Sequence, residues 1–181
     1  MGPYTIGGKW LDDLNADLTG SDRSCAVLAG AILDDRLLRL LQAYLLPPAK
    51  SSEDRLFGRG RPLDTFAARI ELARRLNLVE PFVAKALDYI RDIRNLAAHK
   101  PDFAFNEDEV ASKVCNVIEK LRLRERASDM LRKPYTGTKG EFLVAVTLLV
   151  AHIEIETGET KLTEHKPTSA LSRFHVCKRD A

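Results

Sequence analysis

The stretch Ser21–Leu46, SDRSCAVLAGAILDDRLLRLLQAYLL, has the strongest helical pattern in the chain. Its apolar residues recur at steps of three and four, which places them on one side of an α-helix. Ser21 is a favourable N-cap, and Asp22 puts a negative charge in the first turn. Two prolines, at 47 and 48, then stop the helix. The stretch therefore predicts a long amphipathic helix over 22–46, with one buried face.

The same spacing returns after a long connection over 47–63. It predicts four further helices, at 64–76, 80–99, 107–132 and 139–156. The expected start signals are an Asp64 N-cap, Pro81 in a first turn, and capping boxes at Asn106–Glu109 and Thr138–Glu141. Alternation with a period of two persists nowhere. We therefore predict an all-α protein, a compact bundle of five to six helices.

Length and composition fit one soluble domain. The chain has 181 residues, of which 45% are hydrophobic and 30% are charged. We expect a single helical domain over 1–157 and a basic, partly ordered C-terminal tail over 158–181. No apolar run is long enough to predict a membrane-spanning helix. Met1–Trp10 lacks the pattern of a signal peptide, so we expect a cytoplasmic protein.

The cysteines and histidines do not form a metal-binding pattern. Cys25, Cys115 and Cys177 are widely separated, which favours reduced thiols. Cys25 and Cys115 have apolar helical neighbours and are expected in the core, and His152 is expected in the core or at an interface. Because no spacing matches a zinc site, we expect neither a metal nor a cofactor.

The net charge of +2 is too small to indicate a partner, but its distribution is uneven. Acidic residues outnumber basic ones over 1–54, whereas basic residues outnumber acidic ones over 120–133 and 161–181. A solvated helix face explains most such runs, and a surface that attracts phosphates is the alternative.

The polar residues at the end of the 80–99 helix are the strongest candidates for a site. Arg94, Asn95 and His99 lie there, just before Lys100-Pro101. One hypothesis is a structural polar clasp, in which these three side chains join the other helices through residues Asp22, Arg23 and Arg69. A carboxylate that faces a guanidinium can form a bidentate pair and hold helices in register.

A second hypothesis is catalytic, because Arg94, Asn95 and His99 also resemble the motif of HEPN endoribonucleases. A histidine can transfer protons near neutral pH, and an arginine can stabilise charge on a phosphate, without a metal. Five residues along a helix correspond to about 140° of rotation. Arg94 and His99 would therefore combine only if the helix end unwinds or two chains pair, as the resemblance implies.

A third hypothesis is a helix-turn-helix over 71–87 that reads DNA directly. The helical period and the Asn77 turn fit this motif. The second helix would offer Glu80, Pro81 and Phe82 at its start, with Lys85 as its one basic residue. Base edges are read mainly by Arg, Lys, Asn and Gln, so this element is a poor reader.

An ordered set of segments resembles the mannitol operon repressor (MtlR-like) family. The segments are Ser21–Arg23, Leu33–Asp35, Gly60–Ile70, Leu76–Leu78 and Ile93–His99. The resemblance runs from about Ser21 to Phe105, and Asn77 stands where that family tends to have glycine. It implies an all-helical bacterial regulator, usually described as a transcriptional repressor.

We therefore predict a non-enzymatic, cytoplasmic bacterial regulator that acts through a protein partner or self-association, as a homo-oligomer such as a dimer. Any contact with nucleic acid would involve the basic C-terminal half or Arg94 and His99. The alternatives are a metal-independent endoribonuclease that uses Arg94, Asn95 and His99, and a repressor that binds DNA through 71–87.

Overall fold

The computed structural model describes residues 16, 20–48, 50, 54–126 and 136–162. Within these ranges the chain forms helices and no strand, so the all-α prediction is confirmed. Six helices are described: α2 (Asp22–Tyr44), α3 (Phe66–Arg75), α4 (Pro81–His99), α5 (Asp108–Lys120), α6 (Leu123–Arg126) and α7 (Gly137–Leu162). No helix in the described part is both long enough and apolar enough to cross a bilayer.

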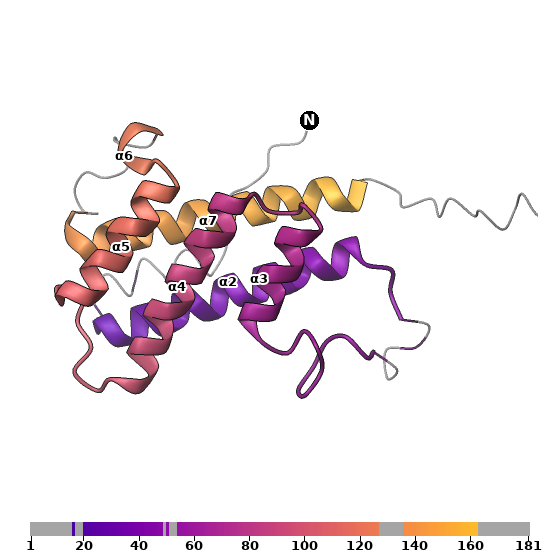
Figure 1. Cartoon of the computed structure of the whole chain (residues 1–181), viewed down its shortest axis with the longest axis horizontal. Helices are drawn as coiled ribbons and strands as arrows, with labels where there is room; N and C mark the ends of the chain where they lie inside the picture. The colour runs from indigo at the N-terminus through magenta and orange to yellow at the C-terminus, as the bar shows by residue number, and fades with distance from the viewer. Residues whose placement is uncertain (1–15, 17–19, 49, 51–53, 127–135, 163–181) are drawn as a thin grey trace, which may run out of the picture.

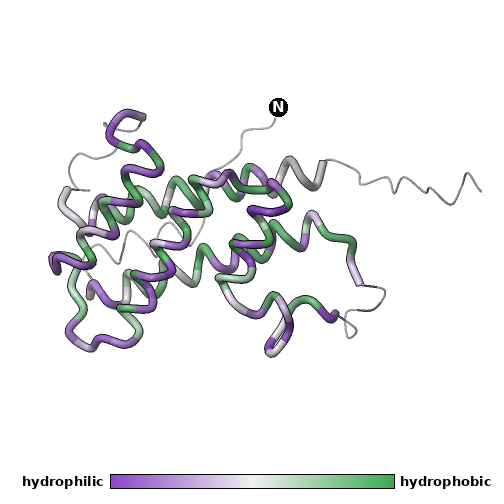
Figure 2. The backbone as a smooth tube through the Cα atoms, viewed as in Figure 1, coloured by the Kyte–Doolittle hydropathy of each residue, from purple (hydrophilic) through white to green (hydrophobic). Residues whose placement is uncertain are grey.

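The bundle is built around α2, which packs against α7, α4 and α3. Figure 1 shows α2 and α7 running along the long axis of the molecule, with α3, α4 and α5 lying across them. The α2 side chains at steps of three and four are buried, as the sequence predicts; they include Ala29, Leu33, Leu37 and Leu41. In Figure 2 the hydrophobic stretches alternate with hydrophilic ones along the helices, as expected of amphipathic helices that share a core.

The connection between α4 and α5 is anchored by aromatic rings. Phe103 and Phe105 meet edge to face, with ring centroids 5.4 Å apart. The Phe105 ring lies 4.9 Å from that of Phe142 on α7, and Phe105 is almost fully buried. Aromatic pairs at these separations are favourable beyond the area that they bury. The connection is therefore part of the core, and it fixes the end of α4 relative to α7.

Three helix starts differ from the prediction. Thr65, not Asp64, is the N-cap of α3, because its side chain accepts a hydrogen bond from Ala68 N. Glu107 is the N-cap of α5, so Asn106 does not open a capping box there. The last helix begins at Gly137, earlier than predicted, and continues to Leu162. Ser21 caps α2 and Pro81 opens α4, as predicted.

The predicted 107–132 helix is interrupted after Lys120. Arg122 adopts a positive φ of 51°, and its amide bonds Glu119 O at 3.0 Å, which ends α5 before the short α6 begins. No glycine or proline marks this position, so the break could not be read from the sequence. Residues 127–132 lie outside the described ranges.

The turn between α3 and α4 is a Schellman motif centred on Asn77. The amide of Asn77 donates to Arg74 O at 3.1 Å, and that of Leu78 donates to Ala73 O at 2.9 Å. Asn77 has a φ of 56°, in the left-handed region, where asparagine is among the best tolerated residues after glycine.

We expect Asn77→Gly to raise the free energy of unfolding by roughly 0.5 kcal/mol, because glycine has no steric cost at positive φ. Asn77→Val should lower it by roughly 1–2 kcal/mol. Urea denaturation followed by circular dichroism measures both effects. As a control, Ala31→Gly, at an exposed position inside α2, should lower stability by about 1 kcal/mol. A loss with Asn77→Gly would contradict this account of the turn.

Candidate functional site

Arg23 joins the first turn of α2 to the last turn of α4. Its Nε donates to Ala97 O at 2.9 Å, and its Nη2 donates to Ala98 O at 3.2 Å. The last carbonyls of a helix lack intrahelical partners and carry partial negative charge. Arg23 therefore caps the end of α4, the same helical turn that carries His99.

Asp22 ties the start of α2 to two other parts of the chain. Its Oδ2 accepts a hydrogen bond from Phe105 N at 2.9 Å, and its Oδ1 lies 3.3 Å from Lys139 Nζ. Lys139 also donates to Gly20 O at 2.8 Å. The carboxylate of Asp22 thus pairs with a lysine on α7, and it holds the α4–α5 connection in place.

Arg69 is the one charged or polar residue in the described ranges that is buried, with 8% of its surface exposed. Its Nη1 donates to Asp34 Oδ1 on α2 at 2.5 Å. Its Nε and Nη2 donate to the carbonyls of Leu63 and Asp64, at 2.9 and 3.2 Å. One guanidinium therefore connects α2, α3 and the end of the loop that precedes α3.

Arg94 lies at a close contact between α4 and α2. A Cβ atom at Gly30 would lie 2.6 Å from Arg94 Cγ and 2.8 Å from Arg94 Cβ, closer than real atoms approach. Glycine at position 30 is therefore required for this packing. The Arg94 guanidinium is exposed, and its Nη1 donates to Asn95 Oδ1 at 3.0 Å. It lines a cleft of about 460 Å³ that Asp34, Arg69 and Arg91 also line.

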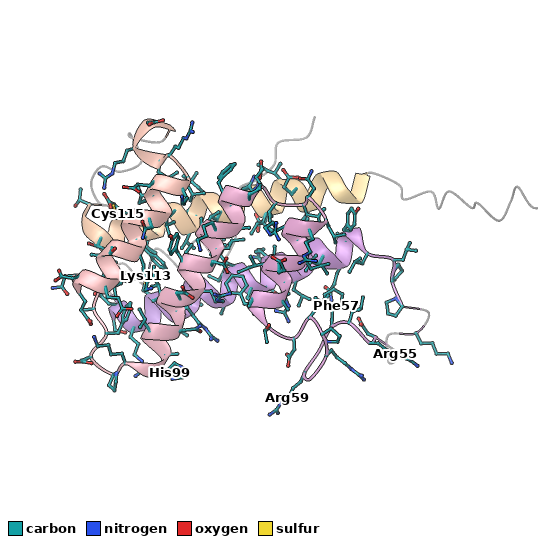
Figure 3. All side chains as sticks on the ribbon, in the orientation of Figure 1. Arg55, Phe57, Arg59, His99, Lys113 and Cys115 are labelled. Atoms are coloured by element: carbon teal, nitrogen blue, oxygen red, sulfur yellow. The ribbon has the colours of Figure 1, made fainter. Side chains whose placement is uncertain are left out.

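His99 lies in a different hollow. The exposed imidazole is in the last turn of α4 and lines a hollow of about 340 Å³ with Asn95, Lys100 and Lys113. Figure 3 shows His99 at the end of α4, on the outside of the bundle. Arg94 and His99 thus lie on different sides of α4, as the helical rotation predicts.

An ion pair closes the loop that follows His99. Lys100 Nζ donates to Glu107 Oε2, and Glu107 Oε1 accepts from Ala104 N at 3.1 Å. The hydrogen bond from Lys100 holds the pKa of Glu107 below its usual range, and the hydrogen bond from Ala104 N makes a smaller contribution in the same direction. Because the pKa of Glu107 is lowered in the folded state, the ion pair stabilises the loop at neutral pH. That stabilisation is lost as the pH falls through the folded-state pKa of Glu107.

The six residues of the predicted clasp are divided among separate contacts. Arg23 reaches α4, Asp22 reaches α7 and the α4–α5 connection, and Arg69 reaches Asp34. Arg94 and Asn95 bond each other; Arg94 is exposed and Asn95 is partly buried. Sequence reasoning did not single out Gly30, Lys139 or the Asp34 carboxylate as contact residues, because each acts through a partner distant in sequence.

Two remaining predictions concern Cys115 and His152. Cys115 is exposed on α5, so its expected place in the core is wrong, whereas Cys25 is buried. His152 is partly buried on α7, and its Nε2 lies 3.3 Å from Glu80 Oε2, an ion pair only when the imidazole is protonated. In the described ranges, no three His, Cys, Asp or Glu residues are grouped so that they could hold a metal.

Comparisons with solved structures address the fold. No protein-family model matches the chain, and no curated protein sequence matches it. A chain of the MtlR–HPr complex from Escherichia coli superposes with a TM-score of 0.59 at 14% identity, covering 81% of this chain and 99% of that one. The two chains share a fold. YggD from Shigella flexneri, a possible transcriptional regulator, superposes with a TM-score of 0.58 at 18% identity, covering 81% and 96%. The resemblance to the MtlR-like family is thus supported at the level of fold.

We expect Arg69→Ala to lower the free energy of unfolding by about 2–4 kcal/mol, because it leaves two carbonyls and a carboxylate without their shared partner. The loss stays below that of a fully buried pair, since 31% of the Asp34 side chain is exposed. Arg75→Ala, which removes an exposed arginine from the same helix, should cost at most about 0.5 kcal/mol. Equal losses in urea denaturation would contradict a special role for Arg69.

Proposed function

We propose that this chain is a non-enzymatic bacterial regulatory protein of the mannitol operon repressor type, which acts by binding a protein partner. The observation that carries the proposal is the superposition with almost the whole of a chain from the MtlR–HPr complex. That chain belongs to a two-protein assembly, and YggD is described as a possible regulator. Because the superposition spans almost the whole of that chain, we infer a shared mode of action from the shared fold.

The polar contacts support this proposal. Asp22, Arg23 and Arg69 all bond to distant elements and hold α2, α3, α4 and α7 together. These contacts give the three side chains a structural role between helices. They therefore support a rigid scaffold on which a partner can bind.

We expect the purified chain to bind an HPr-type protein from the same organism, or to self-associate, in a saturable way. Isothermal titration calorimetry tests the first outcome, and light scattering over a range of concentrations tests the second. A heat-unfolded sample is the control for non-specific association. A monomer that gives no heat with HPr would contradict the proposal.

A second candidate is a metal-independent endoribonuclease, which the exposure of Arg94 and His99 favours. The hydrogen bond between Arg94 and Asn95 leaves the guanidinium at the surface, where a phosphate could reach it. Because Arg94 and His99 line different hollows, such a site would require the α4 helices of two chains to combine.

For this candidate, RNA incubated with the protein and a chelator should be cleaved, and Arg94→Ala and His99→Ala should each slow cleavage about 100-fold or more. Arg75→Ala, an exposed arginine on α3, serves as the matched control. Gel electrophoresis of labelled RNA measures the rate. Intact RNA, or cleavage that both variants retain, excludes the endoribonuclease.

Direct DNA reading through 71–87 has the least support. The α4 helix buries Val83, Ala84 and Leu87, and Lys85 Nζ lies over the Tyr89 ring, 5.0 Å from its centroid. Its first turn thus offers few hydrogen-bond donors to base edges. Contact through the basic C-terminal half remains a proposal, because six of the eleven basic residues in 120–133 and 161–181 lie outside the described ranges.

A further inference from the structure

Two large apolar side chains are exposed close together where α2 leads into the following loop. Leu46 has 71% of its surface exposed and Leu56 has 43%, and both line a hollow of about 450 Å³. Leu45 and Phe57 also line it. Figure 2 shows hydrophobic colour at the end of α2 and again in the loop. In the described ranges, one other large apolar residue, Phe82, is comparably exposed.

The loop over 54–64 has a defined conformation. Leu63 N donates to Leu56 O at 2.9 Å, and this bond closes the loop. Asp54 Oδ1 accepts from the amides of Leu56 and Phe57, at 2.8 and 3.0 Å. Arg69 binds the carbonyls at the end of the loop and thereby fixes it to α2. The exposed leucine at 56 is therefore held in place by the backbone around it.

The charges of the loop face outward and are mostly basic. Arg55, Arg59 and Arg61 are all exposed. Within the described ranges Arg55 and Arg59 form no ion pair. The pKa of Asp54 is lowered by hydrogen bonds from the backbone and, to a smaller extent, by the charge of Arg61. The two acids of the loop are engaged with the backbone, since Asp54 accepts from Leu56 N and Asp64 Oδ2 accepts from Gly60 N at 2.7 Å. Figure 3 shows Arg59 at the tip of the loop, pointing away from the bundle, and Arg55 near the start of the loop, also away from the helices.

We propose that Leu46, Leu56, Arg55, Arg59 and Arg61 form a docking surface, the loop surface, for an acidic partner segment that also carries apolar side chains. Carboxylates of the partner would meet the exposed guanidiniums, and its apolar residues would cover the two leucines. A nucleic-acid backbone would use the arginines and leave the leucines exposed, so the combination favours a peptide. The inference rests on the proposed function, because it assigns that function a surface and a class of partner.

The test uses the full chain and a fluorescein-labelled helical peptide of glutamate and leucine, with binding followed by fluorescence anisotropy. Arg55→Glu/Arg59→Glu should weaken binding about tenfold or more, and so should Leu46→Ser/Leu56→Ser. Arg75→Glu/Arg124→Glu, a charge reversal at two exposed arginines elsewhere, should change it by about twofold at most. Circular dichroism verifies that every variant folds.

Two further peptides test whether binding needs both the acidic and the apolar residues of the partner, and an RNA tests whether the surface binds nucleic acid instead. A peptide with serine in place of leucine, and one with lysine in place of glutamate, should both bind far more weakly. Equal binding of either peptide overturns the proposal. So does tighter binding of a short single-stranded RNA that depends steeply on salt and does not respond to Leu46→Ser/Leu56→Ser.

The peptide-binding test of the loop surface can fail or succeed independently of the HPr and self-association tests of the proposed function. If HPr or self-association is detected and the glutamate–leucine peptide does not bind, the loop surface is wrong and the regulatory proposal stands. If the peptide binds through the loop surface while HPr and self-association fail, the loop surface stands and the partner assignment falls.

Discussion

The buried guanidinium of Arg69 is the interaction on which the arrangement of α2, α3 and the preceding loop depends. A buried arginine is costly unless its charge and its donors are satisfied. Here Asp34 supplies the opposite charge, and the carbonyls of Leu63 and Asp64 accept the other hydrogen bonds. Because these acceptors come from two separate segments, satisfying one side chain fixes the position of both.

The same logic applies at the N-terminal end of α2. Arg23 satisfies the last carbonyls of α4, and Asp22 satisfies the amide of Phe105. Phe105 in turn packs against Phe142 of α7, so polar and aromatic contacts converge on one connection. The bundle is therefore held at two separate places by side chains that bond to backbone groups.

The helices were predictable to the extent that local signals define them. The apolar period of α2, its Ser21 cap and the start of α4 at Pro81 follow from neighbouring residues alone. The end of α5 was not predictable, because Arg122 adopts a left-handed conformation that its residue type does not favour. The exposure of Cys115 was also missed, because an apolar neighbourhood in sequence does not identify which side of a helix is covered.

The sequence by itself determined the fold class, the approximate bounds of α2, α3 and α4, and the residues worth testing, because each depends on spacing within a few turns of helix. Only the tertiary structure decided what those residues contact. Arg69 on α3 bonds Asp34 on α2, and Arg94 on α4 lies against Gly30 on α2. In both pairs the two residues are far apart in the sequence. Such pairings depend on how helices cross, and helix crossing is set by the packing of the whole core rather than by any local pattern.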